Sequence, residues 1–196
     1  MQYVKGISAY QNQRPTAITL GKFDGLHRGH ELLIERVIKH QNEDDVDGVV
    51  VAFDMSPLLK KIGKEPTFIL TNEEKAERLR GRIRYFIDCP FDERISSIEA
   101  EAFIEEVLVQ CFHAKYVVVG TDFRFGHEKR GDYHMLQEFG KIYGFEVEVF
   151  EKKRYGDREI SSTYIKEELE NGNVELAIQL LGYDYKKNVK KHFDNE

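Results

Sequence analysis

The chain has 196 residues, of which 41% are hydrophobic, and this is enough for one α/β domain with a buried core. The formal net charge is −6, with acidic and basic residues mixed along the chain, which argues against nucleic-acid binding and favours small-molecule partners. No apolar stretch approaches the roughly 20 residues of a membrane span, and the N-terminus has no signal-peptide pattern, so we expect a cytoplasmic protein.

Short β-branched runs alternate with longer amphipathic segments along most of the chain. The runs predict strands buried on both faces, at residues 17–20, 48–53, 85–88, 116–120 and 145–150. Helical patterns lie between them, at residues 30–40, 71–80, 98–112 and 131–143. This alternation predicts a doubly wound, Rossmann-like α/β fold, with a parallel sheet of about five strands, helices on both faces and right-handed crossovers.

The pattern changes after residue 150. A polar stretch leads to Ile160, helical periodicity continues to Leu169, and an Asn-Gly-Asn break precedes a second short helix that ends near Gly182. We expect a small C-terminal helical subdomain here. Residues 186–196 are highly charged and poor in apolar side chains, which is typical of a solvated tail. The sequence therefore predicts one domain over residues 1–185 and a charged tail after it.

Cys89 and Cys111 are the two cysteines of the chain. They have no CxxC spacing, and no histidine is positioned with them as a zinc site. We therefore expect inert core thiols, with no disulfide framework and no structural metal.

The strongest chemical signal follows the first predicted strand, where residues 21–30 read Gly-Lys-Phe-Asp-Gly-Leu-His-Arg-Gly-His. Ligands of open α/β sheets bind where a strand ends and a helix begins. Glycines let backbone N–H groups approach a polyphosphate, and the helix N-terminus adds a favourable positive field. His27 and His30 lie on one side of a helical turn, so both can face the same phosphate as hydrogen-bond donors to developing charge.

An isolated pair of histidines at this spacing is also compatible with two other interpretations. It could be a surface pair beside a tight turn, or two of three metal ligands. The preceding strand, the following helix and the flanking glycines favour the phosphate interpretation.

A second motif, Gly-Thr-Asp-Phe-Arg-Phe-Gly, begins at Gly120 where the fourth predicted strand ends. Aromatic faces can border a flavin or adenine ring, and guanidinium groups suit phosphate oxygens. On composition alone, alternate phenylalanines are better explained as core residues on one face of a sheet. The candidate contacts of this region are Asp122, Phe123, Arg124, Phe125 and Arg130.

A third motif, Ile-Ser-Ser-Thr, begins at Ile160 and precedes a predicted helix. One hydroxyl of Ser161, Ser162 or Thr163 can cap the helix, which is the commoner use of such residues. A helix start rich in hydroxyls and N–H groups can also hold phosphates, with Lys166 adding positive charge one turn later. The two roles are compatible.

These three motifs, in this order across residues 18–185, resemble those of bacterial FAD synthetases. That family forms the FMN adenylyltransferase half of bifunctional riboflavin kinase/FAD synthetases and belongs to the HxGH nucleotidyltransferase superfamily. The resemblance implies that AMP passes from ATP to FMN, giving FAD and pyrophosphate, with Mg²⁺ accompanying ATP. It also implies an FMN adenylyltransferase domain over residues 1–185, without the riboflavin kinase domain that most bacterial relatives carry.

The resemblance further implies a set of site residues. His27 and His30 would be catalytic, stabilising the α- and β-phosphates. The nucleotide-binding residues would be Gly21, Lys22, Phe23, Asp24, Gly29, Gly120, Arg130, Ser161, Ser162, Thr163 and Lys166. The flavin-binding residues would be Phe53, Asp54, Pro57, Asp122, Phe123, Arg124 and Phe125. No residue is assigned as a dedicated metal ligand.

The sequence departs from the family pattern at two places. Tyr164 and Lys166 stand where relatives usually carry arginines, and lysine keeps the charge but lacks the planar guanidinium fork. Residues 53–57 read Phe-Asp-Met-Ser-Pro, where the family typically has Phe-x-Pro-His-Pro. Two alternatives therefore stay open. One is a nucleotidyltransferase for another phosphorylated acceptor, such as a pantetheine, nicotinamide mononucleotide or glycerol phosphate; the other is a non-catalytic flavin- or nucleotide-binding protein.

Overall fold

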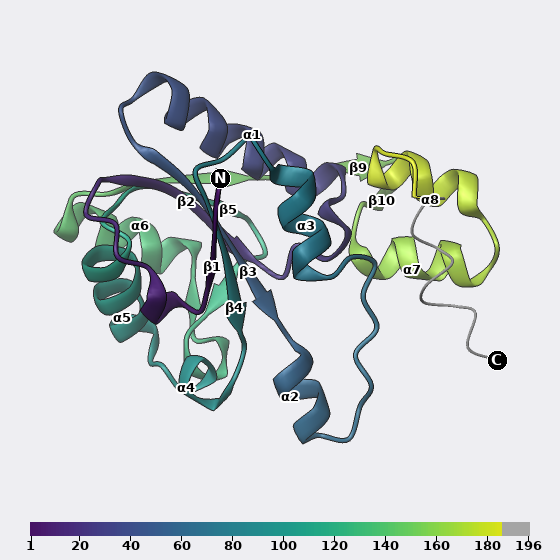
Figure 1. Ribbon diagram of the computed structural model, residues 1–196, viewed down its shortest axis with the longest axis horizontal. Helices are drawn as coiled ribbons and strands as arrows, with labels where there is room; N and C mark the ends of the chain where they lie inside the picture. The colour runs from purple at the N-terminus through teal and green to yellow at the C-terminus, as the bar shows by residue number, and fades with distance from the viewer. Residues whose placement is uncertain (186–196) are drawn as a thin grey trace.

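Six parallel strands form the central sheet of the computed structural model, which describes residues 1–185 (Figure 1). Across the sheet the order is β1 (Gln2–Lys5), β4 (Tyr85–Pro90), β3 (Asp47–Asp54), β2 (Thr16–Gly21), β5 (Ala114–Gly120) and β8 (Glu146–Phe150). The predicted α/β fold is confirmed. The strand that the sequence did not indicate is β1, a four-residue strand at the edge of the sheet with only partly buried side chains.

Alternate residues of the strands enter two different cores. Val49 and Val51 pack with Ile104 on one face of the sheet, whereas Val50 packs with Ile34 on the other face, and all five are fully buried. Burial of one such side chain stabilises the fold by about 1.5–3 kcal/mol. Helices on both faces explain why the strands read as continuous apolar runs rather than as alternating ones.

The longer helices cover the two faces of the sheet. One face is covered by α1 (Arg28–Glu43) and α3 (Asn72–Leu79). The other is covered by α5 (Ala100–Ala102), the π-helical segment η3 (Phe103–Cys111) and α6 (Tyr133–Tyr143). Short elements join them: η1 (Ile7–Ala9), η2 (Asp24–Leu26), α2 (Ser56–Lys61), α4 (Glu93–Ser96), η4 (His127–Lys129), and the two-stranded pairs β6 (Arg124–Phe125) with β7 (Gly131–Asp132) and β9 (Arg154–Tyr155) with β10 (Arg158–Glu159).

Capping residues fix where the helices begin. The Thr71 hydroxyl accepts a hydrogen bond from the Glu74 N–H, and the Glu74 carboxylate accepts one from the Thr71 N–H, so α3 begins with a capping box. Asp132 is the N-cap of α6, and its carboxylate accepts a hydrogen bond from the Met135 N–H. This helix therefore begins at Tyr133, two residues later than the sequence pattern indicated. The predicted helix over residues 98–112 is divided into a short α-helix and a π-helical segment.

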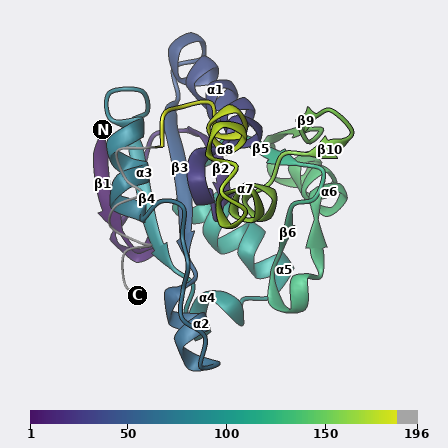
Figure 2. The ribbon, with the colours of Figure 1, turned by 90° about the vertical axis from the view of Figure 1, so that its right-hand side faces the viewer.

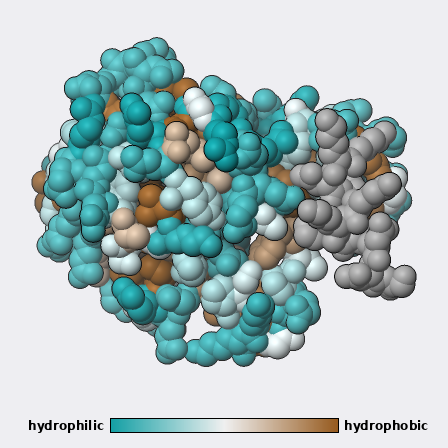
Figure 3. Space-filling view, in the orientation of Figure 1, coloured by the Kyte–Doolittle hydropathy of each residue, from teal (hydrophilic) through white to brown (hydrophobic). Residues whose placement is uncertain are grey.

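The expected C-terminal helices are α7 (Ser162–Glu170) and α8 (Val174–Leu181), which pack against each other beside β9 and β10 (Figures 1 and 2). The predicted charged tail, residues 186–196, lies outside the described residues. No helix in residues 1–185 is both long and apolar enough to cross a membrane. The face drawn in Figure 3 is mostly hydrophilic, with hydrophobic residues exposed in small separate groups.

The two cysteines differ in burial. Cys89 is buried, and this burial raises the pKa of its thiol to about 12. Cys111 is only half-buried, so it lies at the margin of the core rather than inside it, although burial still raises its pKa. A raised pKa disfavours the reactive thiolate at neutral pH, as expected for inert thiols.

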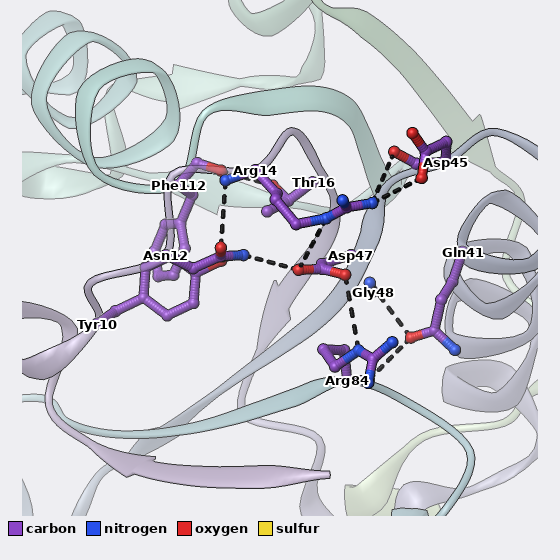
Figure 4. A network of polar contacts seen from close by, with 10 residues as sticks. All are labelled: Tyr10, Asn12, Arg14, Thr16, Gln41, Asp45, Asp47, Gly48, Arg84 and Phe112. Atoms are coloured by element: carbon purple, nitrogen blue, oxygen red, sulfur yellow. Dashed lines mark hydrogen bonds and ion pairs between the residues drawn. The ribbon is translucent and has the colours of Figure 1, made fainter.

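A polar network braces the amino-terminal ends of β2 and β3 (Figure 4). The buried Asp47 carboxylate accepts a hydrogen bond from Asn12 at 2.8 Å and lies 3.6 Å from both the Arg14 and Arg84 guanidinium groups. The Gln41 side-chain oxygen accepts from the Gly48 and Arg84 N–H groups. These contacts join α1, β3 and two loops at the amino-terminal ends of the strands, away from their carboxyl ends.

The Asp47→Asn substitution is expected to lower the free energy of unfolding by about 1–3 kcal/mol, because it weakens a charge-assisted hydrogen bond and two ion pairs around a buried group. For a chain of this length, that corresponds to a fall in melting temperature of about 2–4 °C per kcal/mol. Urea and thermal unfolding would measure the effect. An unchanged melting temperature would show that the network does not stabilise the fold.

Candidate active site

The order of the strands reverses direction at β2. From β2 the chain continues to β3 and β4 on one side, and it then returns to β5 and β8 on the other side of β2. Ligands of open α/β sheets bind outside the carboxyl ends of the strands at such a reversal. The loop that begins at Gly21 and the loop that begins at Gly120 both start at this point.

The loop after β2 has an unusual backbone. Phe23, Gly25 and Leu26 have φ angles of 49°, 80° and 40°. Residues other than glycine rarely adopt such positive values. Packing maintains this conformation, since Phe23 is only 1% exposed. A Cβ added at Gly25 would also lie 3.0 Å from an Ile69 methyl group. Strained backbone of this kind persists where the surrounding structure over-determines it, which is common at functional sites.

The Asp24 carboxylate ties the loop to two distant segments. One carboxylate oxygen accepts a hydrogen bond from the Ile69 N–H at 2.8 Å, and the other lies 2.7 Å from the Lys166 ammonium of α7. Lys166 also donates to the Thr67 carbonyl at 2.7 Å. The predicted positive charge of Lys166 is thus at the site, and in this structure it is paired with Asp24.

The C-terminal helices hold the same turn through its carbonyl groups. The Ser162 hydroxyl donates to the Asp24 carbonyl at 2.9 Å, and the Tyr183 hydroxyl donates to the Gly25 carbonyl at 2.7 Å. Ser161 caps α7 by accepting from the Tyr164 N–H, as the capping interpretation of this motif expected. The exposed Thr163 lies in the first turn of that helix.

The two histidines of the motif lie face to face. Their ring centroids are 3.6 Å apart, with an angle of 20° between the ring planes. His27 is the N-cap of α1, and its Nδ1 accepts a hydrogen bond from the Gly29 N–H at 3.2 Å. A neutral ring that accepts at Nδ1 carries its proton on Nε2, so His27 has an Nε2–H donor for a ligand.

Burial keeps both imidazoles neutral. It lowers the pKa of His27 to about 4, although the negative charges of Asp24 and Asp122 oppose the shift. Burial also lowers the pKa of His30 well below its ordinary value, and the nearby His27 and Lys75 contribute in the same direction. His30 Nδ1 is buried without a hydrogen-bond partner in residues 1–185. Buried polar groups normally have partners, so this nitrogen is a candidate ligand contact.

The second motif contributes a carboxylate to the same region. Asp122 lies 3.0 Å from the Lys152 ammonium, which is also 3.1 Å from Glu159. Beside the larger lowering by burial, the negative charge of Asp122 raises the pKa of His27 and the positive charge of Lys152 lowers it. A Cβ at Gly120 would lie 3.0 Å from the Asp122 carboxylate, so the absence of a side chain makes room for this group.

Other residues of the second motif are engaged elsewhere. Phe125 is buried in the core, with its ring centroid 5.4 Å from that of Phe103 and 5.6 Å from that of Phe123. The exposed Arg124 donates to the carbonyl of Phe123. Arg130 forms ion pairs with two acidic residues of the α5 region, Glu99 and Glu101. The core interpretation accounts for the burial of Phe125, and ligand contacts by these residues stay predictions.

The candidate flavin contacts after the second predicted strand lie at the carboxyl end of β3, next to β2. Phe53 is half-buried and packs edge-on against Phe91 at 5.6 Å between centroids. The Asp54 carboxylate accepts from the N–H and hydroxyl of Ser56, which turns the chain into α2. Pro57 is in the first turn of that helix.

Sequence reasoning missed two lysines near this site, Lys75 and Lys152. The buried side of α3 consists of Asn72, Lys75, Ala76 and Leu79, a spacing at which helices normally place apolar residues. A lysine and an asparagine in that pattern were a detectable signal. Lys152 gave no comparable signal, since it lies in a polar stretch after β8 and its partners are distant in sequence.

Comparison with known proteins agrees with this geometry. The model of the FAD synthetase family matches residues 9–164. The chain belongs to the FAD synthetase family. This confirms the resemblance drawn from the three motifs.

Two FAD synthetase relatives show how much of their length is shared. The bifunctional riboflavin kinase/FMN adenylyltransferase of Escherichia coli K12 is 32% identical over 196 residues, which cover 94% of this chain and 60% of the relative. The protein of the same name from Haemophilus influenzae is 32% identical over 189 residues, with 95% and 61% covered. The chain therefore spans about 60% of the length of these curated relatives.

Solved structures resemble this FAD synthetase family member in fold. A structure described as a macrolide-efflux protein from Streptococcus pneumoniae has a TM-score of 0.78 at 28% identity, covering 93% of this chain and 60% of that one. Pantoate-beta-alanine ligase from Francisella tularensis has a TM-score of 0.54 at 13% identity, covering 93% and 78%. The second likeness is one of fold alone.

The lowered pKa of His27 predicts a pH dependence of stability. As the pH falls below 6.5, the ordinary pKa, the unfolded chain takes up a proton that the folded chain does not accept until about pH 4. The free energy of unfolding should therefore fall across this interval, and His27→Gln should make the fall shallower. Urea unfolding at several pH values would measure this. An NMR titration that gives His27 a pKa near 6.5 would contradict it.

Proposed function

We propose that this chain transfers AMP from ATP to FMN, forming FAD and releasing pyrophosphate. The observation that carries the proposal is the strained loop after β2, which brings two neutral, stacked histidines to the N-terminus of α1 in a member of the FAD synthetase family. A helix N-terminus with glycines beside it suits a polyphosphate. The relatives named above are described as FMN adenylyltransferases, which supports FMN as the acceptor.

In the proposed reaction, a phosphate oxygen of FMN attacks the α-phosphorus of ATP, and the bond from that phosphorus to the bridging oxygen of pyrophosphate breaks. Catalysis of such a transfer consists mainly of positioning and charge stabilisation. The Nε2–H of His27 would donate to the oxygens that gain charge, and the N-terminus of α1 adds a positive field. A neutral imidazole is an effective donor here because its N–H can donate without the desolvation cost of a buried positive charge.

The nucleotide would contact the groups that converge on the loop. In the proposal, His30, Ser162, Thr163 and Lys166 face the phosphates, with the backbone of residues 21–24 and Gly29 around them. A Cβ at Gly29 would lie 3.1 Å from the His27 ring, so glycine lets the chain pass close to the imidazole. Lys166 would exchange part of its contact with Asp24 for phosphate oxygens, while Asp24 keeps its bond to the Ile69 N–H.

The flavin would lie across the carboxyl ends of β3 and β5. The proposal assigns it Phe53, Asp54, Pro57, Asp122, Phe123, Arg124 and Phe125, and it assigns Gly120 and Arg130 to the nucleotide. The half-buried Phe53 supports an aromatic border on the β3 side. Asp122 supports a polar border on the β5 side, where it is paired with Lys152.

We propose that Mg²⁺ enters with ATP. Residues 1–185 contain no group of three histidine, cysteine, aspartate or glutamate side chains arranged as a metal site. In proteins, Mg²⁺ that accompanies a nucleotide is usually held mainly by substrate phosphates and water, with one or two carboxylates. The cation would neutralise the triphosphate, and Asp122, whose negative charge acts on His27, is a carboxylate that could assist it.

The proposal also extends to the setting of the reaction. Residues 1–185 would act as an FMN adenylyltransferase domain that uses ATP and FMN, without nucleic acid or membrane partners. We place the reaction in the cytoplasm, where both substrates are available.

The decisive assay is pyrophosphate release by the purified protein with ATP, Mg²⁺ and FMN. Parallel reactions contain riboflavin or no acceptor, and the flavin product is identified by mass. FAD formed from FMN but not from riboflavin is the expected result. Pyrophosphate released only with another phosphorylated acceptor would replace FMN in the proposal, and ATP binding without turnover would favour a non-catalytic role.

His30→Ala should lower kcat by about 10² or more, because it removes a preorganised group from the transition state, while the fold is retained. His134→Ala is the matched control, since His134 is exposed on α6. Steady-state kinetics and circular dichroism of both variants measure the effect. Wild-type turnover in a folded His30→Ala protein would remove His30 from the mechanism.

A further inference from the structure

A buried lysine lies directly beneath the loop after β2. Lys75 of α3 is only 3% exposed, and its ammonium donates to the Lys22 carbonyl at 2.9 Å and to the Asn72 side-chain oxygen at 2.7 Å. Within residues 1–185 it has no carboxylate oxygen within 4.0 Å. Burial lowers the pKa of Lys75, although the negative charges of Asp24 and Asp54 oppose the shift.

Such a lysine is costly to the fold. Buried charges are normally paired, and an ammonium that contacts only neutral oxygens recovers little of its lost hydration. An apolar side chain at this position would pack against the buried Ala76 and Leu79 without that cost. The retained charge therefore indicates a role that packing alone does not provide.

A chain of hydrogen bonds fixes the ammonium from below. The Asn72 amide donates to the Asp88 carboxylate at 2.6 Å and to the Ala52 carbonyl at 3.2 Å, which turns its oxygen toward Lys75. The other Asp88 oxygen accepts from the Tyr3 hydroxyl at 2.7 Å. Through Asn72, the Lys75 ammonium is thus linked to β1, β3 and β4. Its remaining hydrogen bond is to the loop, at the Lys22 carbonyl.

The bond to the Lys22 carbonyl sets the orientation of one peptide group. In a trans peptide the C=O and the following N–H point in opposite directions, so a carbonyl held by Lys75 turns the Phe23 N–H away from α3. Phe23 is also the first loop residue with a positive φ, 49°. Lys75 therefore stabilises the local conformation on which the phosphate-binding backbone depends.

We propose that Lys75 is a positioning residue for the adenylyl transfer, and this inference rests on the proposed function. Its ammonium holds the peptide between Lys22 and Phe23 so that the Phe23 N–H faces the ATP phosphates, and its unpaired charge adds a positive potential beneath them. His30 is close enough for this charge to affect its pKa, so the potential reaches the proposed transition-state site. Lys75 itself does not contact the substrate.

The test compares Lys75→Met, which removes the charge at similar length, with Lys75→Arg, which keeps it. Asp47→Asn is the matched control, because it perturbs a buried polar network at the opposite edge of the sheet. For Lys75→Met we expect kcat to fall about 10–100-fold, with the KM for FMN changed less than about threefold. Lys75→Arg should recover part of the loss, and the control should keep its turnover while melting at a lower temperature.

Three outcomes would overturn the proposal. They are turnover of Lys75→Met within about twofold of wild type, no recovery in Lys75→Arg, or failure of both Lys75→Met and Lys75→Gln to fold, which would assign the lysine to stability alone. If the wild-type protein forms no FAD, the proposed function fails separately. The Kd for ATP with Mg²⁺, measured by calorimetry, then decides: a weakening of about tenfold or more in Lys75→Met supports the positioning role, and an unchanged Kd overturns it.

Discussion

The arrangement of the site depends on the buried Asp24 carboxylate, which ties the turn after β2 to two distant segments. Asp24 lies in the turn after β2, and it binds the Ile69 N–H of the loop before α3 and the Lys166 ammonium of α7. These segments are distant in sequence, so folding must bring all of them together before the turn has its final shape. The turn has positive φ angles at Phe23 and Leu26, which are unfavourable for residues with a Cβ. The surrounding contacts stabilise this backbone conformation. The histidines, which follow the turn directly, take their places from it.

The electrostatic character of the site follows from burial. Burial lowers the pKa of both imidazoles and keeps them neutral, at His27 against the opposing charges of Asp24 and Asp122, whereas Lys75 is buried beside neutral oxygens. Lysines at the rim are instead paired with carboxylates: Lys166 with Asp24, and Lys152 with Asp122. A polyphosphate would therefore meet neutral donors and two cations whose partners it can replace, while the Lys75 ammonium lies beneath the loop without contacting it. This combination favours an anionic ligand without leaving the ligand-free site strongly charged.

The stabilising polar network and the candidate site lie at opposite ends of the strands. The network around Asp47 joins the amino-terminal ends of β2 and β3 (Figure 4). The candidate site lies at the carboxyl ends of the same strands. The departure at Tyr164 fits a structural role, because its ring is buried and is covered by the Arg158 guanidinium at 3.9 Å. At position 164 this chain thus has a packed aromatic ring, and Lys166 is the cation of that helix beside the turn.

The sequence alone determined the fold class, five of the six central strands and the family, because buried strands and glycine-rich phosphate loops leave local patterns that persist in any context. It also assigned His27, His30, Ser162 and Lys166 to one site, and in the structure Ser162 and Lys166 contact the turn that leads to the histidines. It could not reveal β1, whose few half-buried residues form a strand only through pairing with β4, nor the pairing of Lys166 with Asp24. The direction in which Phe125 packs, the neutrality of the histidines and the position of Lys75 under the loop were decided by tertiary structure, since burial and long-range contacts arise only when distant segments meet.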